Sequence, residues 1–314
     1  MSFNFYQSRT QGEILAEVVR HGMVESLHSG HLVMLNADGS IHLQKGAIEL
    51  PMYGRSSLKA MQAAGMLRSG LKVTPEQLAL ICASHSGTAL HQSVAKSMLT
   101  DSGLDESALR NTPDKPLAEE ERKNWGEPTR LAQNCSGKHA GMLRTCVING
   151  WDLESYRSPD HPLQIAIKAE FEALTEESVF ATTVDGCGAP LFATSTLGLA
   201  RAFRTMTISD DPIYQEIMGA CRANPLLVAG EGRLTTRLMR AIPGLFMKEG
   251  AEAVEVATLP DGRTLVFKIV DGSNRAFGPI VQAAFKEWGI DSLDEGVTIL
   301  GGGEPVGSIR ALIA

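Results

Sequence analysis

Segments typical of β-strands lie at both ends of this chain, and segments typical of helices fill its middle. Near the N-terminus, the apolar run 31–35 precedes the turn sequence Asn-Ala-Asp-Gly at 36–39, which predicts a hairpin. Near the C-terminus, the alternating runs 253–257 and 264–270 flank Pro-Asp-Gly at 260–262 and predict a second hairpin. An antiparallel sheet built from both termini, with a helical layer inserted between them, accommodates this order.

This order predicts an α/β protein of the α+β kind, with a single domain over residues 1–314. The sheet part would take about residues 1–55 and 245–314, and the helical part about residues 56–244. A chain of 314 residues suffices for one large domain or two small ones. No linker, repeat or low-complexity segment divides this sequence, so a single domain is expected.

Several helices have recognisable start signals. The sequence Thr-Pro-Glu-Gln at 74–77 matches a capping box with proline at the first helical position. Pro212 begins another helix, and Asp160 is expected to cap a helix over residues 161–174. Residues 105–129 are charged and contain three prolines, which predicts a long excursion on the surface.

Composition and charge exclude several classes of protein. The net charge is −7 and no dense basic run occurs, so nucleic acid is not an expected partner. No apolar run approaches the roughly 20 residues of a membrane span, and the polar stretch Met1–Arg9 lacks the apolar core of a secretion signal. The five scattered cysteines form no disulfide framework. We therefore expect a cytoplasmic protein with free thiols.

The sequence Asn-Cys-Ser-Gly-Lys-His at 134–139 gathers a thiol, a hydroxyl, an amine and an imidazole beside a glycine. Helix-compatible residues follow, so Asn134 or Ser136 is expected to cap a helix. The N-terminus of that helix would favour a thiolate or a bound carboxylate. A capped helix with a buried cysteine is the simpler alternative.

Ser56 and Lys59 lie three residues apart and would share one face of a helix. A serine hydroxyl needs a base to become a nucleophile, and a partly desolvated lysine can act as one. Penicillin-binding proteins and class A β-lactamases use such a Ser-x-x-Lys pair. The pattern is short and common by chance, so a capping serine beside a solvated lysine is the alternative.

Two further motifs carry chemistry. The sequence Ala-Ser-His-Ser-Gly-Thr at 83–88 is either a polar loop or the source of a second hydroxyl facing Ser56. In Asp-Gly-Cys-Gly-Ala-Pro at 185–190, Asp185 could hold an ammonium group. Cys187 could join Cys135, a neutral lysine or histidine from 138–139 and a water in a tetrahedral zinc site. The spacing matches no zinc finger, so two unrelated buried thiols remain the alternative.

Two lysines near the C-terminus are candidates for a further catalytic role. Ser-x-x-Lys acyl enzymes carry a lysine on a strand facing the nucleophile, within a Lys-x-Gly pattern. Lys248 and Lys268 could each fill that place, or both could be solvated lysines at strand ends.

Taken together, the motifs resemble the Rhizobium-type L-asparaginase family. Arg-Ser-Ser-x-Lys at 55–59, Ala-Ser-His-Ser-Gly at 83–87, Asn-Cys-Ser-Gly-Lys-His-Ala-Gly-Met at 134–142 and Asp-Gly-Cys-Gly-Ala-Pro at 185–190 occur in the family's order. The match extends to His-Pro-Leu-Gln at 161–164, Lys-x-Gly-Ala-Glu at 248–252, Asp-Gly-Ser-x-Arg-Ala at 271–276 and Val-Glu-Ser-x-His-x-Gly at 24–30. The resemblance therefore spans nearly the whole chain.

The resemblance implies a fold similar to serine β-lactamases and glutaminases, a homodimer, and hydrolysis of L-asparagine to L-aspartate and ammonia. It implies zinc and no organic cofactor. The roles that it implies are a nucleophile and its base at Ser56 and Lys59, a second pair of Ser84 with preferably Lys268, zinc ligands at Cys135, Lys138 and Cys187, and substrate contacts at Arg55, His139, Asp185, Gly186 and Lys248.

One position departs from the family pattern. Thr88 stands where the family often has an acidic residue, which could change the affinity for substrate or the local water network. A glutaminase or another Ser-x-x-Lys acyl hydrolase remains the nearer rival function. A non-catalytic protein that binds zinc or senses redox state through two cysteines is the rival from another class.

Overall fold

An antiparallel sheet of eight strands joins the two ends of the chain in the computed structural model, which describes residues 12–291 and 294–313. Its order is β10-β11-β1-β2-β9-β8-β7, with β3 paired to β2. The strands are β1 (Glu13–Arg20), β2 (Met23–Leu35), β3 (Ile41–Lys45), β7 (Phe246–Gly250), β8 (Val254–Thr258), β9 (Thr264–Ile269), β10 (Val297–Gly301) and β11 (Glu304–Ala311). The predicted fold class, with a sheet drawn from both termini, is confirmed.

Both predicted hairpins form. Leu35 of β2 lies opposite Ile41 of β3 across the first turn. Thr258 of β8 lies opposite Thr264 of β9 across the second. The N-terminal and C-terminal strands then meet where β1 pairs with β11 and β2 pairs with β9, all antiparallel. This order makes β7 one edge of the sheet.

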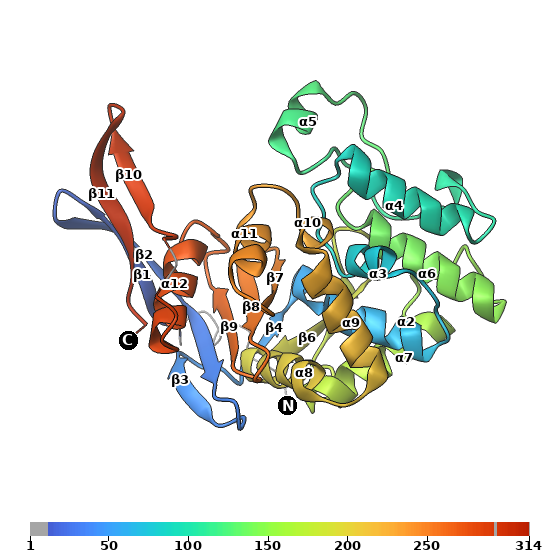
Figure 1. The fold of residues 1–314 in the computed structure, drawn as a ribbon, viewed down its shortest axis with the longest axis horizontal. Helices are drawn as coiled ribbons and strands as arrows, with labels where there is room; N and C mark the ends of the chain where they lie inside the picture. The colour runs from blue at the N-terminus through green and yellow to red at the C-terminus, as the bar shows by residue number, and fades with distance from the viewer. Residues whose placement is uncertain (1–11, 292–293, 314) are drawn as a thin grey trace.

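The residues between the two sets of strands form most of the helices, which gather on one side of the sheet (Figure 1). They are η1 (Arg55–Leu58), α2 (Lys59–Arg68), α3 (Pro75–Ile81), α4 (Ala89–Thr100), η2 (Glu106–Ala108), α5 (Glu119–Asn124), α6 (Ser136–Asn149), α7 (Pro162–Thr175), α8 (Thr196–Ile208), α9 (Pro212–Ala223), α10 (Pro225–Val228) and α11 (Leu234–Ala241). A helix α12 (Phe277–Glu287) follows β9, and a small sheet orders β4 (Pro51–Tyr53), β6 (Pro190–Ser195) and β5 (Thr182–Val184).

Helix starts agree with the sequence in some places and differ in others. Thr74 and Gln77 form the predicted capping box, and α9 begins at Pro212. The predicted cap of α6 is wrong: Cys135 is its N-cap residue without a side-chain bond, because the hydroxyl of Ser136 is hydrogen-bonded to a buried histidine instead. The cap of α7 is His161 rather than Asp160, since the His161 ring accepts from the backbone of the first turn.

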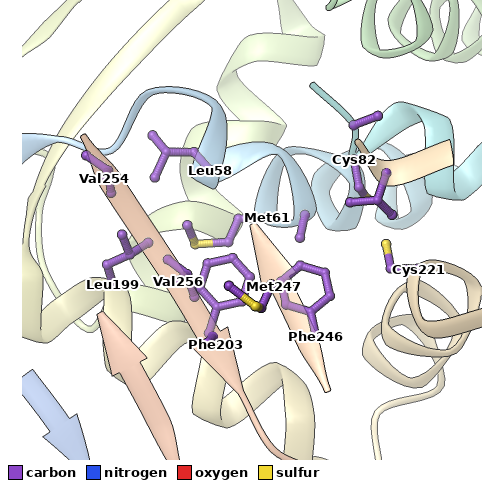
Figure 2. Close-up of a cluster of buried hydrophobic side chains, with 14 of the residues drawn as sticks. Leu58, Met61, Cys82, Leu199, Phe203, Cys221, Phe246, Met247, Val254 and Val256 are labelled. Carbon is purple, nitrogen blue, oxygen red and sulfur yellow. The ribbon is translucent and has the colours of Figure 1, made fainter. Parts of the chain in front are cut away.

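Aromatic and aliphatic side chains fix the edge of the sheet against the helices (Figure 2). Phe203 of α8 stacks on Phe246 of β7 with ring centroids 5.3 Å apart. In the same cluster, Val254 of β8 lies near Leu58 at the end of η1, and Val256 lies near Phe203. All of these side chains are buried, and burial of such apolar area is the main stabilising term in folding. The packing holds η1 and α2 beside β7, where the candidate site lies.

The proline-containing excursion lies largely on the surface, as predicted, and contains η2 and α5. An isolated antiparallel bridge joins Asp114 to Thr129 and closes its base. The backbone of Ala118 donates to the carbonyl of Ser86, which fastens the excursion over the loop that precedes α4.

The structure bears on one of the two predictions about location. Within residues 12–291 and 294–313, no helix has the length and apolar character needed to cross a membrane. The stretch Met1–Arg9, on which the expectation about secretion depends, lies outside the described residues.

The contact between β7 and η1 tolerates no side chain at Gly250. A Cβ atom there would lie 2.4 Å from the backbone oxygen of Gly54. We expect Gly250→Ala to lower the free energy of unfolding in urea by about 1–3 kcal/mol, because backbone must move to admit the methyl group. Gly219→Ala is the matched control, since nothing lies within 4 Å of a Cβ on this exposed helical residue. Equal stability of the two variants would contradict the close contact.

Candidate active site

Two buried lysines meet one serine hydroxyl. Lys248 Nζ donates to Ser84 Oγ at 2.8 Å, and Lys59 Nζ donates to the same oxygen at 3.4 Å. Lys248 lies on β7, Lys59 begins α2, and Ser84 lies in the loop between α3 and α4. Both lysines are 1% exposed, so solvent contributes little to satisfying their amines. The three residues form a continuous chain from Lys59 through Ser84 to Lys248.

The expected pairing of Ser84 with Lys268 is wrong. Lys268 Nζ donates to the carbonyl of Ile269 at 2.7 Å and to the carbonyl of Glu252. The physical reason is the strand order, which puts β8 between β9 and the edge strand β7. The edge strand β7 reaches the serine loop, so Lys248 takes the place that Lys268 was expected to fill. The Lys-x-Gly pattern, which Lys248 satisfies and Lys268 does not, is the sequence signal that could have favoured Lys248.

Lys268 instead lines a cavity of about 500 Å³. Arg55 lines the same cavity, and the remaining walls come mainly from β4, β5, β6 and the residues around them. Ser84, Lys59 and Lys248 are not among its lining residues. This cavity therefore borders the candidate site through Arg55 and does not enclose the serine.

The surroundings of Lys248 disfavour a charged amine. Burial holds the pKa of Lys248 well below its ordinary value, and the positive charges of Lys59 and then Arg233 lower it further. Glu255 and Cys135 act in the opposite sense. A lysine held neutral in this way can accept a proton from a hydroxyl.

Ser56 lies at the start of the helical segment and is partly exposed. Arg55, directly before it, has a φ of +53°, a conformation that non-glycine residues rarely adopt. An ion pair of 2.8 Å between Arg55 Nε and Asp185 Oδ1 holds the arginine there. The structure shows hydrogen bonds from Lys59 to Ala83 and Ser84, and none within the described residues to Ser56.

Asp185 remains ionised despite its burial. Burial acts to raise the pKa of Asp185, but Lys138 and Arg55 outweigh it and hold that pKa below its ordinary value. The backbone N–H of Gly186 also donates to Asp185 Oδ1 at 2.8 Å. The pair of Arg55 and Asp185 therefore offers opposite charges side by side.

Cys135, Cys187 and Lys138 come together from separate motifs. Lys138 Nζ donates to Cys187 Sγ at 3.3 Å, and the Cys135 thiol is hydrogen-bonded to the same sulfur. This bond lowers the pKa of Cys187 well below its ordinary value and, with burial, raises that of Cys135 to about 12. Burial opposes the charge of Lys138, but the two cysteines outweigh it and raise its pKa. One thiolate thus faces one ammonium group.

The donor set of this cluster is unusual. No group of three or more His, Cys, Asp and Glu side chains capable of holding a metal occurs among residues 12–291 and 294–313. Two sulfurs and one amine meet here instead. Close by, His139 is hydrogen-bonded through Nδ1 to the Tyr156 hydroxyl at 2.7 Å, and its buried Nε2 has no partner. Burial and then Lys138 hold the pKa of His139 well below its ordinary value, so the ring is neutral.

Several residues near the site were not predicted. Tyr156 and Arg157 belong to none of the predicted motifs. Arg157 lies so close to Gly188 that a Cβ there would be 2.2 Å from its guanidinium, which explains the second glycine of the 185–190 motif. Arg233 follows Gly-Glu-Gly, a weak signal of close backbone approach. No sequence motif pointed to Glu255, which lies within a strand of mostly apolar residues.

Thr88, the residue that departs from the family pattern, has a hydrogen-bond partner on the next helix. Its hydroxyl is hydrogen-bonded to Nδ1 of His91 at 2.7 Å. His91 Nε2 in turn lies 3.0 Å from the carbonyl oxygen of Leu226. Thr88 and His91 therefore link the start of α4, next to the serine loop, to α10.

Glu255 is a buried acid near the two lysines. It is 0% exposed, one of its oxygens has no partner, and burial raises its pKa from an ordinary value of 4.5 to about 8. Between these two values the folded chain binds one proton more than the unfolded chain. Its contribution to stability therefore falls as the pH rises through this range.

We expect Glu255→Gln to remove this loss, because glutamine cannot ionise. The difference in free energy of unfolding between the variant and the wild type should therefore shift in favour of the variant by on the order of 2–4 kcal/mol when the pH rises from about 5 to about 8. Urea unfolding at both pH values measures this difference. Glu216→Gln, an exposed change on α9, is the control and should show no such gain. A pH-independent difference would contradict the protonated state of Glu255.

Comparison with solved structures finds distant similarity. A β-lactamase from Mycobacterium bovis is similar at 13% identity, over 82% of this chain and 94% of that chain, with a TM-score of 0.43. A candidate β-lactamase from Bacteroides dorei is similar at 13% identity, over 78% of this chain and 86% of that chain, with a TM-score of 0.42. No curated protein matches the sequence.

Comparison with protein families gives a match over almost the entire chain. The family described as L-asparaginase II matches residues 16–310. This range contains Ser56, Ser84, both lysines of the buried chain and the thiol cluster. The match therefore covers all the stretches in which the sequence resembled an asparaginase. The chain belongs to the L-asparaginase II family and is an amidohydrolase.

Proposed function

We propose that the protein hydrolyses L-asparagine to L-aspartate and ammonia through an acyl-enzyme. The observation that carries this proposal is the buried chain of Lys59, Ser84 and Lys248 in a member of the L-asparaginase II family. Two amines that share one hydroxyl can take up and return a proton without bulk water. Amide hydrolysis needs both movements, one to activate the nucleophile and one to release ammonia.

Charges beside this chain suit an amino-acid substrate. The carboxylate of Asp185 can bind the α-ammonium group of asparagine, and the guanidinium of Arg55 can bind its α-carboxylate. The neutral ring of His139 offers the unpartnered Nε2 as a further polar contact. Because Arg55 directly precedes Ser56, binding at this pair would bring the side-chain amide near the Ser56 hydroxyl.

We assign Ser56 as the nucleophile and Lys59 as its base, with Ser84 and Lys248 completing the proton path. Ser56 Oγ bonds to the amide carbon while its proton moves to Lys59, which in the same step gives up a proton through Ser84 to the neutral amine of Lys248. The carbon–nitrogen bond then breaks, the nitrogen takes a proton and ammonia leaves. Water cleaves the resulting ester by the reverse transfers, which releases aspartate. Backbone N–H groups at the start of η1 are candidate donors to the oxyanion.

We further propose that Cys135, Cys187 and Lys138 hold a zinc ion. Two sulfurs and an amine are donors that suit zinc and leave a fourth position open. When bound, the ion would supply a positive charge that orients the substrate, since Ser56 already provides the nucleophile. The protein groups would do the rest: Asp185 and Arg55 bind the substrate, and the lysines move the proton.

Replacement of each serine tests the assignment of roles. Ser56→Ala should lower kcat by several orders of magnitude, because the nucleophile is lost. Ser84→Ala should cost about 10²–10⁴-fold, the usual contribution of proton transfer. Ser57→Ala is the control, since Ser57 Oγ donates to the Gly54 carbonyl at 2.7 Å and its loss leaves the proton path intact. Ammonia release from asparagine measures the rates, and mass spectrometry of trapped enzyme identifies the acylated peptide.

The outcomes of this assay separate the alternatives. Acylation of Ser84 with an active Ser56→Ala variant would exchange the two roles. Faster ammonia release from glutamine would favour a glutaminase, since one methylene changes binding by only about 1–3 kcal/mol. No ammonia from either substrate would favour the non-catalytic thiol protein. The homodimer and the cytoplasmic location remain predictions, the first of which light scattering can measure.

Metal content tests the zinc proposal. We expect about one zinc ion per chain in purified protein by elemental analysis, from one cluster of three donors. Cys135→Ala and Cys187→Ala should both lose zinc and mainly raise KM. Cys146→Ala is the matched control, because this buried cysteine lies in α6 away from the cluster and should retain zinc. Absence of zinc together with normal kinetics in both cluster variants would overturn the proposal.

A further inference from the structure

Arg233 contacts both sides of the Ser84–Lys248 pair. Its Nη1 donates to the backbone carbonyl of Ser84 at 2.6 Å. Its Nη2 forms an ion pair with the carboxylate of Glu249. Glu249 follows Lys248 on β7, and its carbonyl accepts a hydrogen bond of 2.6 Å from Lys248 Nζ. One guanidinium thus joins the serine loop to the strand that carries the lysine.

The backbone near Arg233 is fastened to the same serine loop. Ser84 N–H donates to the carbonyl of Val228, and Ser86 N–H donates to that of Ala229 at 2.7 Å. A Cβ at Gly230 would lie 1.8 Å from Ser86 Oγ, so only glycine allows this approach. Arg233 is the N-cap residue of α11, which packs on β7. The position of the guanidinium is therefore set by backbone contacts as well as by its own bonds.

Charged and titratable groups surround Lys248 from several elements. Lys59 faces it from α2, Arg233 from the start of α11 and Glu255 from β8. Cys135 faces it from the start of α6, and Cys221 from α9. The two cations disfavour charge on Lys248, whereas Glu255 favours it. Since Glu255 is protonated at neutral pH, its opposing effect is weak there.

Arg233 keeps its own charge under these conditions. Burial lowers the pKa of Arg233 from 12.5 to about 10, which is still far above neutral pH. Its ion pair with Glu249 leaves the carboxylate on the side away from Lys248, because consecutive residues of a strand point to opposite faces. Arg233 is therefore a fixed cation near an amine that must be neutral to accept a proton.

We propose that Arg233 is a positioning residue for the Ser84–Lys248 pair, because its two guanidinium nitrogens hold the backbone carbonyl of Ser84 and the side-chain carboxylate of Glu249. The charge of Arg233 also favours the neutral amine of Lys248. This inference rests on the proposed function, because it gives Arg233 a role in the proton path assigned there. It extends that function to a residue that touches neither substrate nor the reacting atoms.

The test is the pH profile of kcat for asparagine hydrolysis in Arg233→Gln, Arg233→Lys and a control. In Arg233→Gln the loss of a positive charge raises the pKa of Lys248. We expect the acidic limb of the kcat profile to move to higher pH by about one unit. At neutral pH, kcat should fall about 10–100-fold while KM changes little. Arg233→Lys keeps the charge but only part of the geometry, so its limb should stay in place while kcat falls.

Arg237→Gln is the matched control. Arg237 lies one turn further along α11, pairs with Glu295 at 2.5 Å and lines the same cavity of about 420 Å³ as Arg233. Its variant should leave both the limb and kcat unchanged. An unmoved limb in Arg233→Gln, or an equal shift in Arg233→Lys, would overturn the proposal.

A measurement without turnover separates this inference from the proposed function. Cyanate carbamylates neutral amines, so the pH dependence of Lys248 carbamylation, followed by peptide mass spectrometry, reports its protonation directly. We expect the midpoint in Arg233→Gln to move upward with the kinetic limb. If the wild type releases no ammonia, the proposed function fails, whereas an unmoved midpoint in Arg233→Gln overturns the role of Arg233 alone.

Discussion

The burial of two lysine amines against one serine hydroxyl is the constraint on which the rest of the site depends. A buried ammonium group loses its hydration, and the energetic response is to lower its pKa or to find partners. Here both responses occur: Lys59 and Lys248 donate to neighbouring carbonyls, and the pKa of Lys248 is well below its ordinary value. The same features that cost stability leave the amine of Lys248 able to accept a proton.

Packing away from the chemistry keeps this arrangement in place. The stacked rings of Phe203 and Phe246 and the valines of β8 fix the edge strand β7 against the helical layer. The backbone oxygen of Gly54 also approaches Gly250 so closely that a side chain of any other residue would clash with it. A candidate site made from a strand, the start of a helix and a loop needs such a rigid contact, because an error of about 1 Å weakens proton transfer and attack.

Charge is distributed so that each buried group has a distinct state. Glu255 is held neutral, Cys187 is held as a thiolate against Lys138, and Asp185 is held ionised by Lys138 and Arg55. Groups whose surroundings push their pKa values apart are typical of acid–base sites. The thiol cluster and the lysine chain are also electrostatically coupled, because Cys135 acts to raise the pKa of Lys248.

The sequence by itself determined several local elements and many residues of the candidate site. Turn residues at 36–39 and 260–262 specified both hairpins, and the Thr74 capping box specified the start of α3, because these signals act within a few residues. The motifs also identified Ser84, Lys59, Cys135, Cys187 and Lys138, which do converge. Only the tertiary structure decided between Lys248 and Lys268, since strand order, a property of distant pairings, puts β7 and not β9 beside the serine. It alone revealed Arg233 and Glu255, whose roles come from burial and from neighbours far away in the sequence.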